Sequence, residues 1–145
     1  MFDNLISKIR TVEEKEKLVE EIKLLNESIY IDKGFGFNSV LKNKIRSWVS
    51  DFFFEEFAKE NIDKEVYLKE LLRIINSLKE VGLRLAFEPS SNAVDRFLGY
   101  LRNATGENII LNLSIDPQII GGVQIIFNGE FRDFSFKKIF EKEFE

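Results

Sequence analysis

The sequence feature that most constrains the fold is a change in the spacing of apolar residues near Leu83. Before this point, from residue 1 to about 81, there is no proline and apolar residues recur every three or four positions, as in amphipathic helices. From Leu83 to Phe87 every second residue is a large apolar one, which indicates a strand. We therefore expect an α+β protein with a helical bundle domain over residues 1–81 and an α/β domain over 82–145.

The helical domain is expected to be a small antiparallel bundle of three main helices. Thr11 and Glu14 have the spacing of a capping box, which predicts the start of the first main helix. The apolar stripe of that helix ends near Tyr30, and the two glycines at positions 34 and 36 indicate a loop.

A second helix is expected to start at Asn38 or Ser39 and to reach Phe57. A third is expected to be capped by Asn61 or Asp63 and to end at Gly82.

The second helix has a wide aromatic face. Successive helical residues are about 100° apart, so the three phenylalanines at 52–54 cannot all face one way. The face is either an imperfectly closed core or a docking surface for a partner helix.

The back half has the order strand, helix, strand, strand, short strand, helix, which without the short strand is a β-α-β-β-α module. Ser90 or Ser91 is expected to cap the first of these helices, and Thr105-Gly106 to close it. Residues 109–115 alternate most clearly and predict a strand. Asp116-Pro117 predicts a turn before a strand at 123–127.

Asn128-Gly129 is a strong hairpin signal, because both central positions of a type I′ turn have positive φ. The short return strand is expected to end at Asp133. Asp133 or Ser135 is then expected to cap a terminal helix, whose one apolar face carries Phe136, Ile139, Phe140 and Phe144.

Composition removes several classes of function. The chain has no cysteine and no histidine, so thiolate chemistry, the usual zinc sites and the commonest general base are excluded. The net charge of −4 argues against binding to nucleic acid phosphates.

No apolar stretch is long enough to span a bilayer, and the first residues do not form a secretory signal. No nucleophile and base pair up, so a small hydrolase using Asp and Glu is the weakest interpretation. We expect no cofactor and no metal.

The segment from Asp116 to Ile125 resembles the signature of the F-type ATP synthase delta subunit family, which includes the oligomycin-sensitivity-conferring protein. Further turn and strand signals lie before and after this segment, in the same order as in the family. The resemblance therefore covers roughly residues 68–145. The helical domain is shorter than is usual in the family, and the family's Asp-Gly-Ser is Asp-Phe-Ser here. The motif residues, expected to have structural roles, are Asp116, Pro117, Ile120, Gly121, Gly122, Gly129, Asp133 and Ser135.

The resemblance implies a non-catalytic peripheral-stalk subunit on the cytoplasmic face of the bacterial plasma membrane. Such a subunit links N-terminal segments of the alpha subunits in the catalytic head to the b-subunit stalk. An alternative is a peripheral-stalk protein of the archaeal and vacuolar-type ATPases, which would carry a longer N-terminal coiled coil, or another assembly adaptor. The excess of phenylalanine, 15 against 3 Tyr and 1 Trp, suits apolar docking. Candidate residues are Trp48, Phe52, Phe53 and Phe57 for alpha, and Phe136, Phe140 and Phe144 for b.

Overall fold

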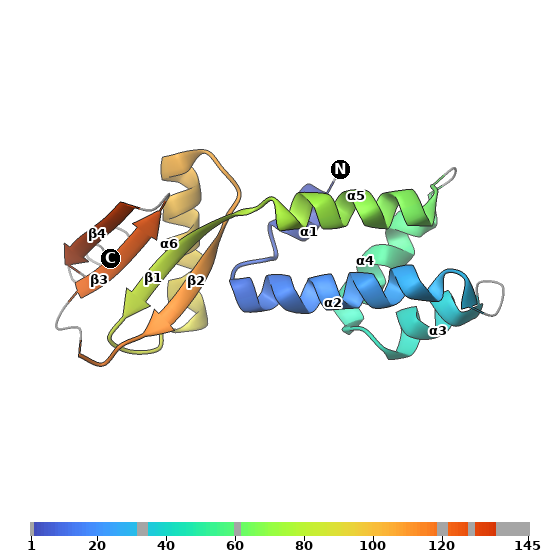
Figure 1. The fold of residues 1–145 in the computed structure, drawn as a ribbon, viewed down its shortest axis with the longest axis horizontal. Coiled ribbons are helices and arrows are strands. Elements are labelled where there is room, and N and C mark those ends of the chain that lie inside the picture. Colours follow the sequence, from blue (N-terminus) through green and yellow to red (C-terminus); the bar gives the residue numbers. More distant parts are fainter. Residues whose placement is uncertain (1, 32–34, 60–61, 119–121, 128–129, 136–145) are drawn as a thin grey trace. The chain divides into compact units, whose positions relative to one another are not determined.

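The computed structural model describes residues 2–31, 35–59, 62–118, 122–127 and 130–135. The chain divides into two compact units (Figure 1), each treated by itself below. The helical unit comprises Met1–Leu5 and Lys15–Ser77, and the sheet unit comprises Ile6–Glu14 and Leu78–Glu145. Five helices precede the first strand and one, α6, lies between two strands, and the predicted α+β class is confirmed.

The helices of the front half are α1 (Asp3–Ile6), α2 (Val12–Ser28), α3 (Phe35–Asn43), α4 (Ser47–Phe57) and α5 (Lys64–Asn76). In the helical unit α2 and α5 run in opposite directions (Figure 1), and the Tyr30 hydroxyl, just after α2, donates a hydrogen bond to the Glu65 carboxylate in the first turn of α5. The fully buried residues of this unit come from α1, α2, α4 and α5, as the periodicity predicts: Leu5, Leu18, Ile22, Leu25, Val49, Phe53, Leu68, Leu71 and Ile75.

The prediction of one helix from Asn38 or Ser39 to Phe57 is wrong, because the structure has two, α3 and α4, and α3 already begins at Phe35. The break is at Arg46, whose φ of −62° and ψ of 147° are extended. The backbone N–H of Arg46 donates to Glu21 Oε2 at 2.7 Å, and its guanidinium donates to Glu21 Oε1 from Nε at 2.9 Å and Nη2 at 2.6 Å. The Glu21 carboxylate on α2 therefore accepts the hydrogen bond that, in a continuous helix, the Arg46 N–H would have donated to a carbonyl of the same helix.

Two helix starts agree with their capping signals. The Glu14 N–H donates to Thr11 Oγ1 at 3.3 Å, although the Glu14 carboxylate accepts from the Arg10 N–H rather than from that of Thr11. Asp63 caps α5 by accepting from the Val66 N–H. The predicted end of this helix at Gly82 is wrong, since α5 stops at Asn76. Residues 79–82 instead pair with a strand, and tertiary pairing overrides their helical spacing.

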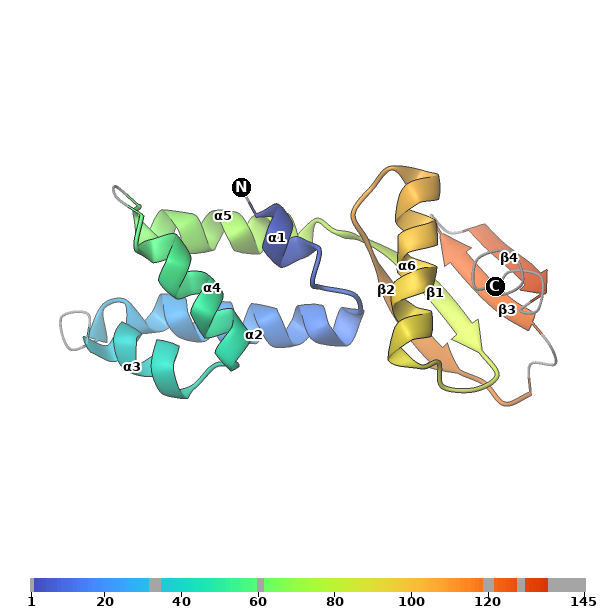
Figure 2. The ribbon, with the colours of Figure 1, turned by 180° about the vertical axis from the view of Figure 1, so that it is seen from behind.

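The sheet unit contains β1 (Lys79–Leu85), α6 (Ser91–Thr105), β2 (Ile109–Ile115), β3 (Gly122–Phe127) and β4 (Glu130–Ser135). Its strand order is β2-β1-β3-β4. Strands β1 and β2 are parallel and are joined through α6, whereas β3 is antiparallel to both β1 and β4. Figure 2 shows α6 lying over the β1 and β2 ribbons. The predicted strand at 109–115 is confirmed.

The core of the sheet unit lies between α6 and the sheet. Val94, Phe97, Leu98 and Leu101 of α6 pack on a layer of strand residues made of Val81, Leu83, Leu85, Ile109 and Leu111. Ser90 caps α6 by accepting from the Ala93 N–H at 3.1 Å, and Gly106 ends it with φ of +69°, as the sequence predicts.

The first strand-forming residues of the sheet unit precede α2. Thr11 forms a parallel bridge with Leu111 of β2, and the Leu111 N–H donates to the Arg10 carbonyl at 2.8 Å. From α6, the Arg102 guanidinium donates to the carbonyls of Ile9 and Ile109. These bonds place residues 6–14 against a sheet whose strands begin at Lys79. The sequence reasoning missed this pairing because a single bridge leaves no alternating pattern.

The end of the described chain differs from the prediction in one respect. Asp133 lies inside β4, paired with Gln124, so its predicted role as the cap of a terminal helix is wrong. The strand continues to Ser135 because Phe134 and Ser135 still pair with Val123 and Gly122. The predicted hairpin at 128–129, the predicted terminal helix and motif residues Ile120, Gly121 and Gly129 lie outside the described residues.

Candidate docking surfaces

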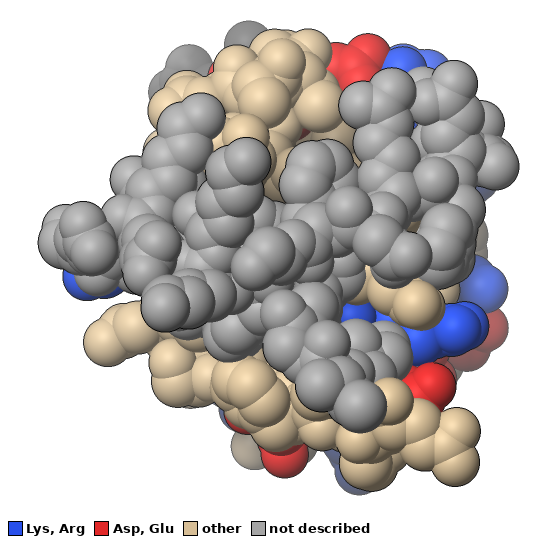
Figure 3. All heavy atoms as spheres, turned by 90° about the vertical axis from the view of Figure 1, so that its left-hand side faces the viewer, with Lys and Arg blue, Asp and Glu red and all other residues tan. Residues whose placement is uncertain are grey.

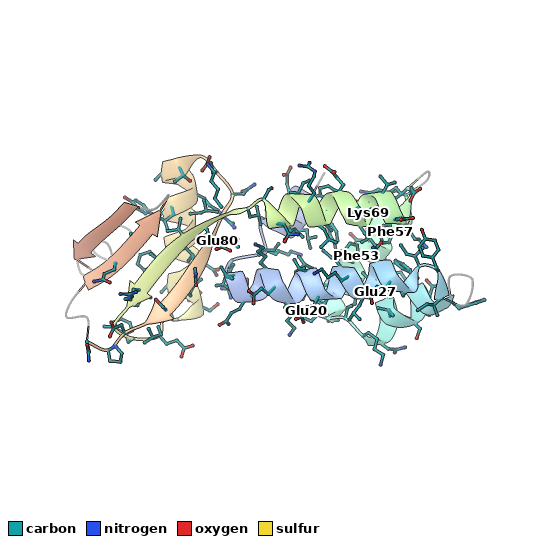
Figure 4. All side chains as sticks on the ribbon, in the orientation of Figure 1. Glu20, Glu27, Phe53, Phe57, Lys69 and Glu80 are labelled. Atoms are coloured by element: carbon teal, nitrogen blue, oxygen red, sulfur yellow. The ribbon has the colours of Figure 1, made fainter. Side chains whose placement is uncertain are left out.

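The inner face of α4 forms an aromatic core. Phe53 is fully buried, and its ring stacks on that of Phe57 at a centroid distance of 5.5 Å (both are labelled in Figure 4). It meets the rings of Phe52 and Tyr67 edge-on. Phe57 also meets Phe37 and Tyr67 edge-on. Of the four aromatic residues selected on this helix, Phe53 therefore lies in the core, where a partner cannot contact it without rearrangement of the unit.

Charged side chains surround this aromatic core. The Lys64 ammonium lies 4.5 Å from the centroid of Phe37 and 6.0 Å from that of Phe57, so Phe57 is partly covered. The Tyr67 hydroxyl donates to Glu56 Oε2 at 3.1 Å. Burial, together with the neighbouring Glu56 carboxylate, raises the pKa of Tyr67 well above its usual range, so Tyr67 stays a neutral donor.

The outer face of α4 is a mixed apolar and acidic surface formed by Trp48, Asp51, Phe52, Phe54 and Glu55. Trp48 and Phe52 are half-buried and one turn apart, and Phe54 is 44% exposed. Asp51 and Glu55 are exposed, and neither has an ion-pair partner among the described residues. The sequence reasoning anticipated that residues 52–54 would not all face one way, but it missed the two acids, which their three- and seven-residue spacing from Trp48 could have indicated.

Arg46 orders one edge of this outer face. Its guanidinium carbon lies 5.0 Å from the centroid of the Trp48 ring while the same group is paired with Glu21. This cation–π contact favours the observed position of the Trp48 ring. Such preorganisation lowers the entropy cost of docking.

A second exposed apolar surface lies at the end of the helical unit where α2 stops and α5 starts. Tyr30 is 72% exposed, Phe35 75% and Val66 64%. The Lys69 ammonium holds the pKa of the Glu65 carboxyl below its usual value, helped by the Tyr30 hydroxyl, which keeps Glu65 a charged acceptor for Tyr30. Nothing in the sequence distinguishes these exposed aromatics from core residues, because they fall at the helix ends.

In the sheet unit the family-motif residues form a turn and a strand start. Asp116 Oδ1 accepts from the Gln118 N–H at 3.0 Å, and the Asp116 N–H donates to the Leu85 carbonyl at 2.7 Å, so Asp116 joins the turn to β1. Pro117 lies in the same turn, and Gly122 begins β3.

Acidic side chains of the described residues do not gather into a metal site. Within the described ranges no three acidic side chains come close enough to hold a metal ion. On the described part of the face seen in Figure 3, basic and acidic side chains lie near one another rather than in a patch of a single sign. Among the described helices, none combines the length and the apolar composition needed to cross a bilayer.

The fold and these surfaces define a two-part α+β protein, with a helical unit ahead of a small mixed sheet. Residues 65–142, more than half of the chain, match the family model described as ATP synthase delta (OSCP) subunit. The chain therefore belongs to the ATP synthase delta (OSCP) subunit family, as the resemblance predicted.

A curated relative agrees with this assignment. The ATP synthase subunit delta of Heliobacterium modesticaldum (strain Ice1) is 31% identical to this chain over 68 residues. The aligned region is 45% of this chain and 37% of the relative, so the chain matches little more than a third of the relative's length.

Proposed function

We propose that this protein is a peripheral-stalk (stator) subunit of a bacterial F-type ATP synthase. It would join the catalytic head to the b-subunit stalk on the cytoplasmic side of the membrane, without catalysing a reaction itself. The single observation that carries the proposal is family membership over residues 65–142. Holding a head against torque requires affinity and stiffness, and apolar surfaces on a rigid helical unit supply both.

The head-side contact is assigned to the outer face of α4, which would receive an amphipathic helix from the N-terminal segment of an alpha subunit. Trp48 and Phe52 would contribute buried apolar area, at roughly 25 cal/mol per Å² before the cost of association. Asp51 and Glu55 would attract basic residues on the incoming helix. Phe53 and Phe57 would act indirectly, by fixing the position of α4 from the core side.

The stalk-side contact is assigned to the apolar residues Phe136, Phe140 and Phe144, which would meet the C-terminal segment of b. These residues lie outside the described structure, and their helical spacing in the sequence is what supports the assignment.

The head-side proposal is tested with the full chain and a synthetic peptide of the alpha N-terminal segment from the same organism. Binding is measured by fluorescence anisotropy, and folding by far-UV circular dichroism. Phe52→Ser should weaken binding about 10-fold or more with the fold retained, because a half-buried interface aromatic is lost. Phe53→Ser should instead unfold the helical unit, because Phe53 is fully buried.

A charge test separates docking from general destabilisation. Asp51→Lys with Glu55→Lys should weaken peptide binding, most strongly at low salt. Glu20→Lys with Glu27→Lys makes the same charge change on exposed positions of α2 (Figure 4) and should leave binding within about 2-fold. Equal loss in both pairs would rule out the outer face of α4 as the contact. Failure of the intact chain to co-purify with the catalytic head and with b would rule out the stator role itself.

A further inference from the structure

The outer edge of β2 is only partly used by the chain itself. Strand β2 is at one end of the sheet order, so its side away from β1 is an edge. The chain pairs with this edge at one bridge, Thr11 with Leu111, and α2 begins at the next residue, Val12. A helix cannot continue a β-ladder, so among the described residues no strand lies beside the edge beyond Leu111.

The directions of two backbone hydrogen bonds show which N–H groups of β2 point away from β1. The Asp116 N–H, just beyond β2, donates to β1, whereas the Leu111 N–H donates outward to Arg10. Because N–H groups alternate in direction along a strand, those of Leu113 and Ile115 point away from β1. Neither has a backbone partner on that side among the described residues. Two consecutive outward sites for a β-ladder are therefore open.

A hollow lies directly beside these two residues. It has a volume of about 220 Å³, and its lining includes Val12, Glu13, Glu88, Pro89, Leu113 and Ile115. Pockets for whole small molecules hold about 300–1,000 Å³, so this one suits a side chain of a larger ligand. Ile115 is 46% exposed, and Pro89 and Leu113 are half-buried, which gives the hollow an apolar wall.

The rim of the hollow is acidic. Glu13 and Glu88 are both exposed, and neither has an ion-pair partner among the described residues. Two unpaired carboxylates beside an apolar wall favour a ligand that combines an apolar side chain with a basic one. They disfavour a second copy of this edge, since that would bring four carboxylates together.

We infer that the edge of β2 from Leu113 to Ile115 is a strand-addition site for an extended peptide segment of a partner protein, with an apolar side chain in the hollow and a neighbouring Lys or Arg on Glu13 and Glu88. Main-chain bonds to the outward N–H and C=O groups supply affinity, and the hollow supplies specificity. The partner strand continues the ladder that Arg10 and Thr11 begin at Leu111. This site is separate from the outer face of α4 and does not depend on which protein supplies the strand.

The test begins with a selection of random twelve-residue peptides, displayed on phage, against the intact chain. Peptides that bind this site should alternate apolar residues and carry Lys or Arg. In the chain labelled for NMR, the amides of Leu113 and Ile115 should exchange with solvent about 10-fold more slowly once such a peptide is bound. The amides of Asn112 and Ser114, which face β1, should change little.

Two matched pairs of variants decide the mode of binding. Ile115→Pro removes the outward N–H while Ile115→Thr keeps it, so affinity for the selected peptide should be about 5-fold lower with Pro than with Thr. Glu13→Lys with Glu88→Lys should lower affinity about 10-fold at low salt, whereas Glu16→Lys with Glu20→Lys should change it less than about 2-fold.

Three results would overturn the inference. One is that no selected peptide depends on the N–H of residue 115. Another is that bound peptides leave the exchange of the Leu113 and Ile115 amides unchanged. The third is concentration-dependent dimerisation, measured by analytical ultracentrifugation, that Ile115→Pro abolishes, which would assign the edge to a second copy. None of these results bears on the stator proposal, which depends on binding of the alpha and b subunits.

Discussion

Replacing Arg46 by alanine removes the guanidinium that pairs with a nearly buried carboxylate in the helical unit. The Glu21 side chain is 7% exposed and that of Arg46 is 26% exposed. The variant Arg46→Ala deletes the two side-chain hydrogen bonds at 2.9 and 2.6 Å but keeps the backbone N–H that donates to Glu21 Oε2. The Glu21 carboxylate then stays buried with one donor instead of three.

The expected cost follows from this geometry. Removing one partner of a buried ion pair costs about 3–5 kcal/mol. A quarter of Arg46 is exposed and one donor survives, so we expect about 2–3 kcal/mol for Arg46→Ala. With a denaturant slope of about 1 kcal/mol/M for a unit of this size, the urea midpoint of the helical unit should fall by about 2–3 M.

The assay uses the only tryptophan of the chain, Trp48, which lies in α4 and reports on the helical unit. Because Arg46 lies over the Trp48 ring, its replacement changes the native emission, so far-UV circular dichroism serves as a second probe of the same transition. The double variant Glu21→Leu with Arg46→Leu should cost less than the sum of the two single leucine variants, by at least about 1 kcal/mol. A loss below about 0.5 kcal/mol for Arg46→Ala, or strict additivity, would refute the assignment of this pair as a stabilising buried ion pair of the helical unit.

Two further predictions concern one residue in each unit. The folded state raises the pKa of Tyr67, so it binds this proton more tightly than the unfolded state does, and stability is lost as the pH rises above about 10. Tyr67→Phe should therefore lose less stability than the parent chain between about pH 8 and about pH 11 in urea unfolding, and parallel curves would contradict the shift. In the sheet unit, Arg102→Leu leaves the Ile9 and Ile109 carbonyls without their donor, at a cost of about 2–4 kcal/mol. Amide exchange in β2 should accelerate while the Trp48 transition stays in place; acceleration in both units would contradict a local role.

The sequence alone predicts the elements whose signals are local. Ser90 and Asp63 cap their helices, and Gly106 ends α6, because capping depends on residues within one turn of each other. The break at Arg46 could not be predicted, because its cause is Glu21, twenty-five residues earlier. The start of β1 at Lys79 likewise depends on pairing with Ile109, which no short window contains.

The candidate surfaces show the same limit. The aromatic content of α4 is plain in the sequence, but which ring is buried depends on neighbours from other helices, and Tyr67 of α5 places Phe53 inside. The open edge of β2 was missed entirely, since it depends on the position of β2 at the end of the strand order and on a chain segment that pairs with it at Leu111 and then leaves the sheet. A long-range pairing followed by a helix start produces no pattern that periodicity detects.

The bridge between Thr11 and Leu111 has a consequence for biosynthesis. At roughly 5–20 residues per second, the ribosome makes residue 111 about 5–20 s after residue 11. During that interval residues 6–11 have no β2 to join, while α2 to α5 are made. Pairing of residues 6–11 with β2 therefore follows the synthesis of α2 to α5, and a nascent chain arrested before Ile109 should leave residues 6–11 open to a protease that the finished protein resists.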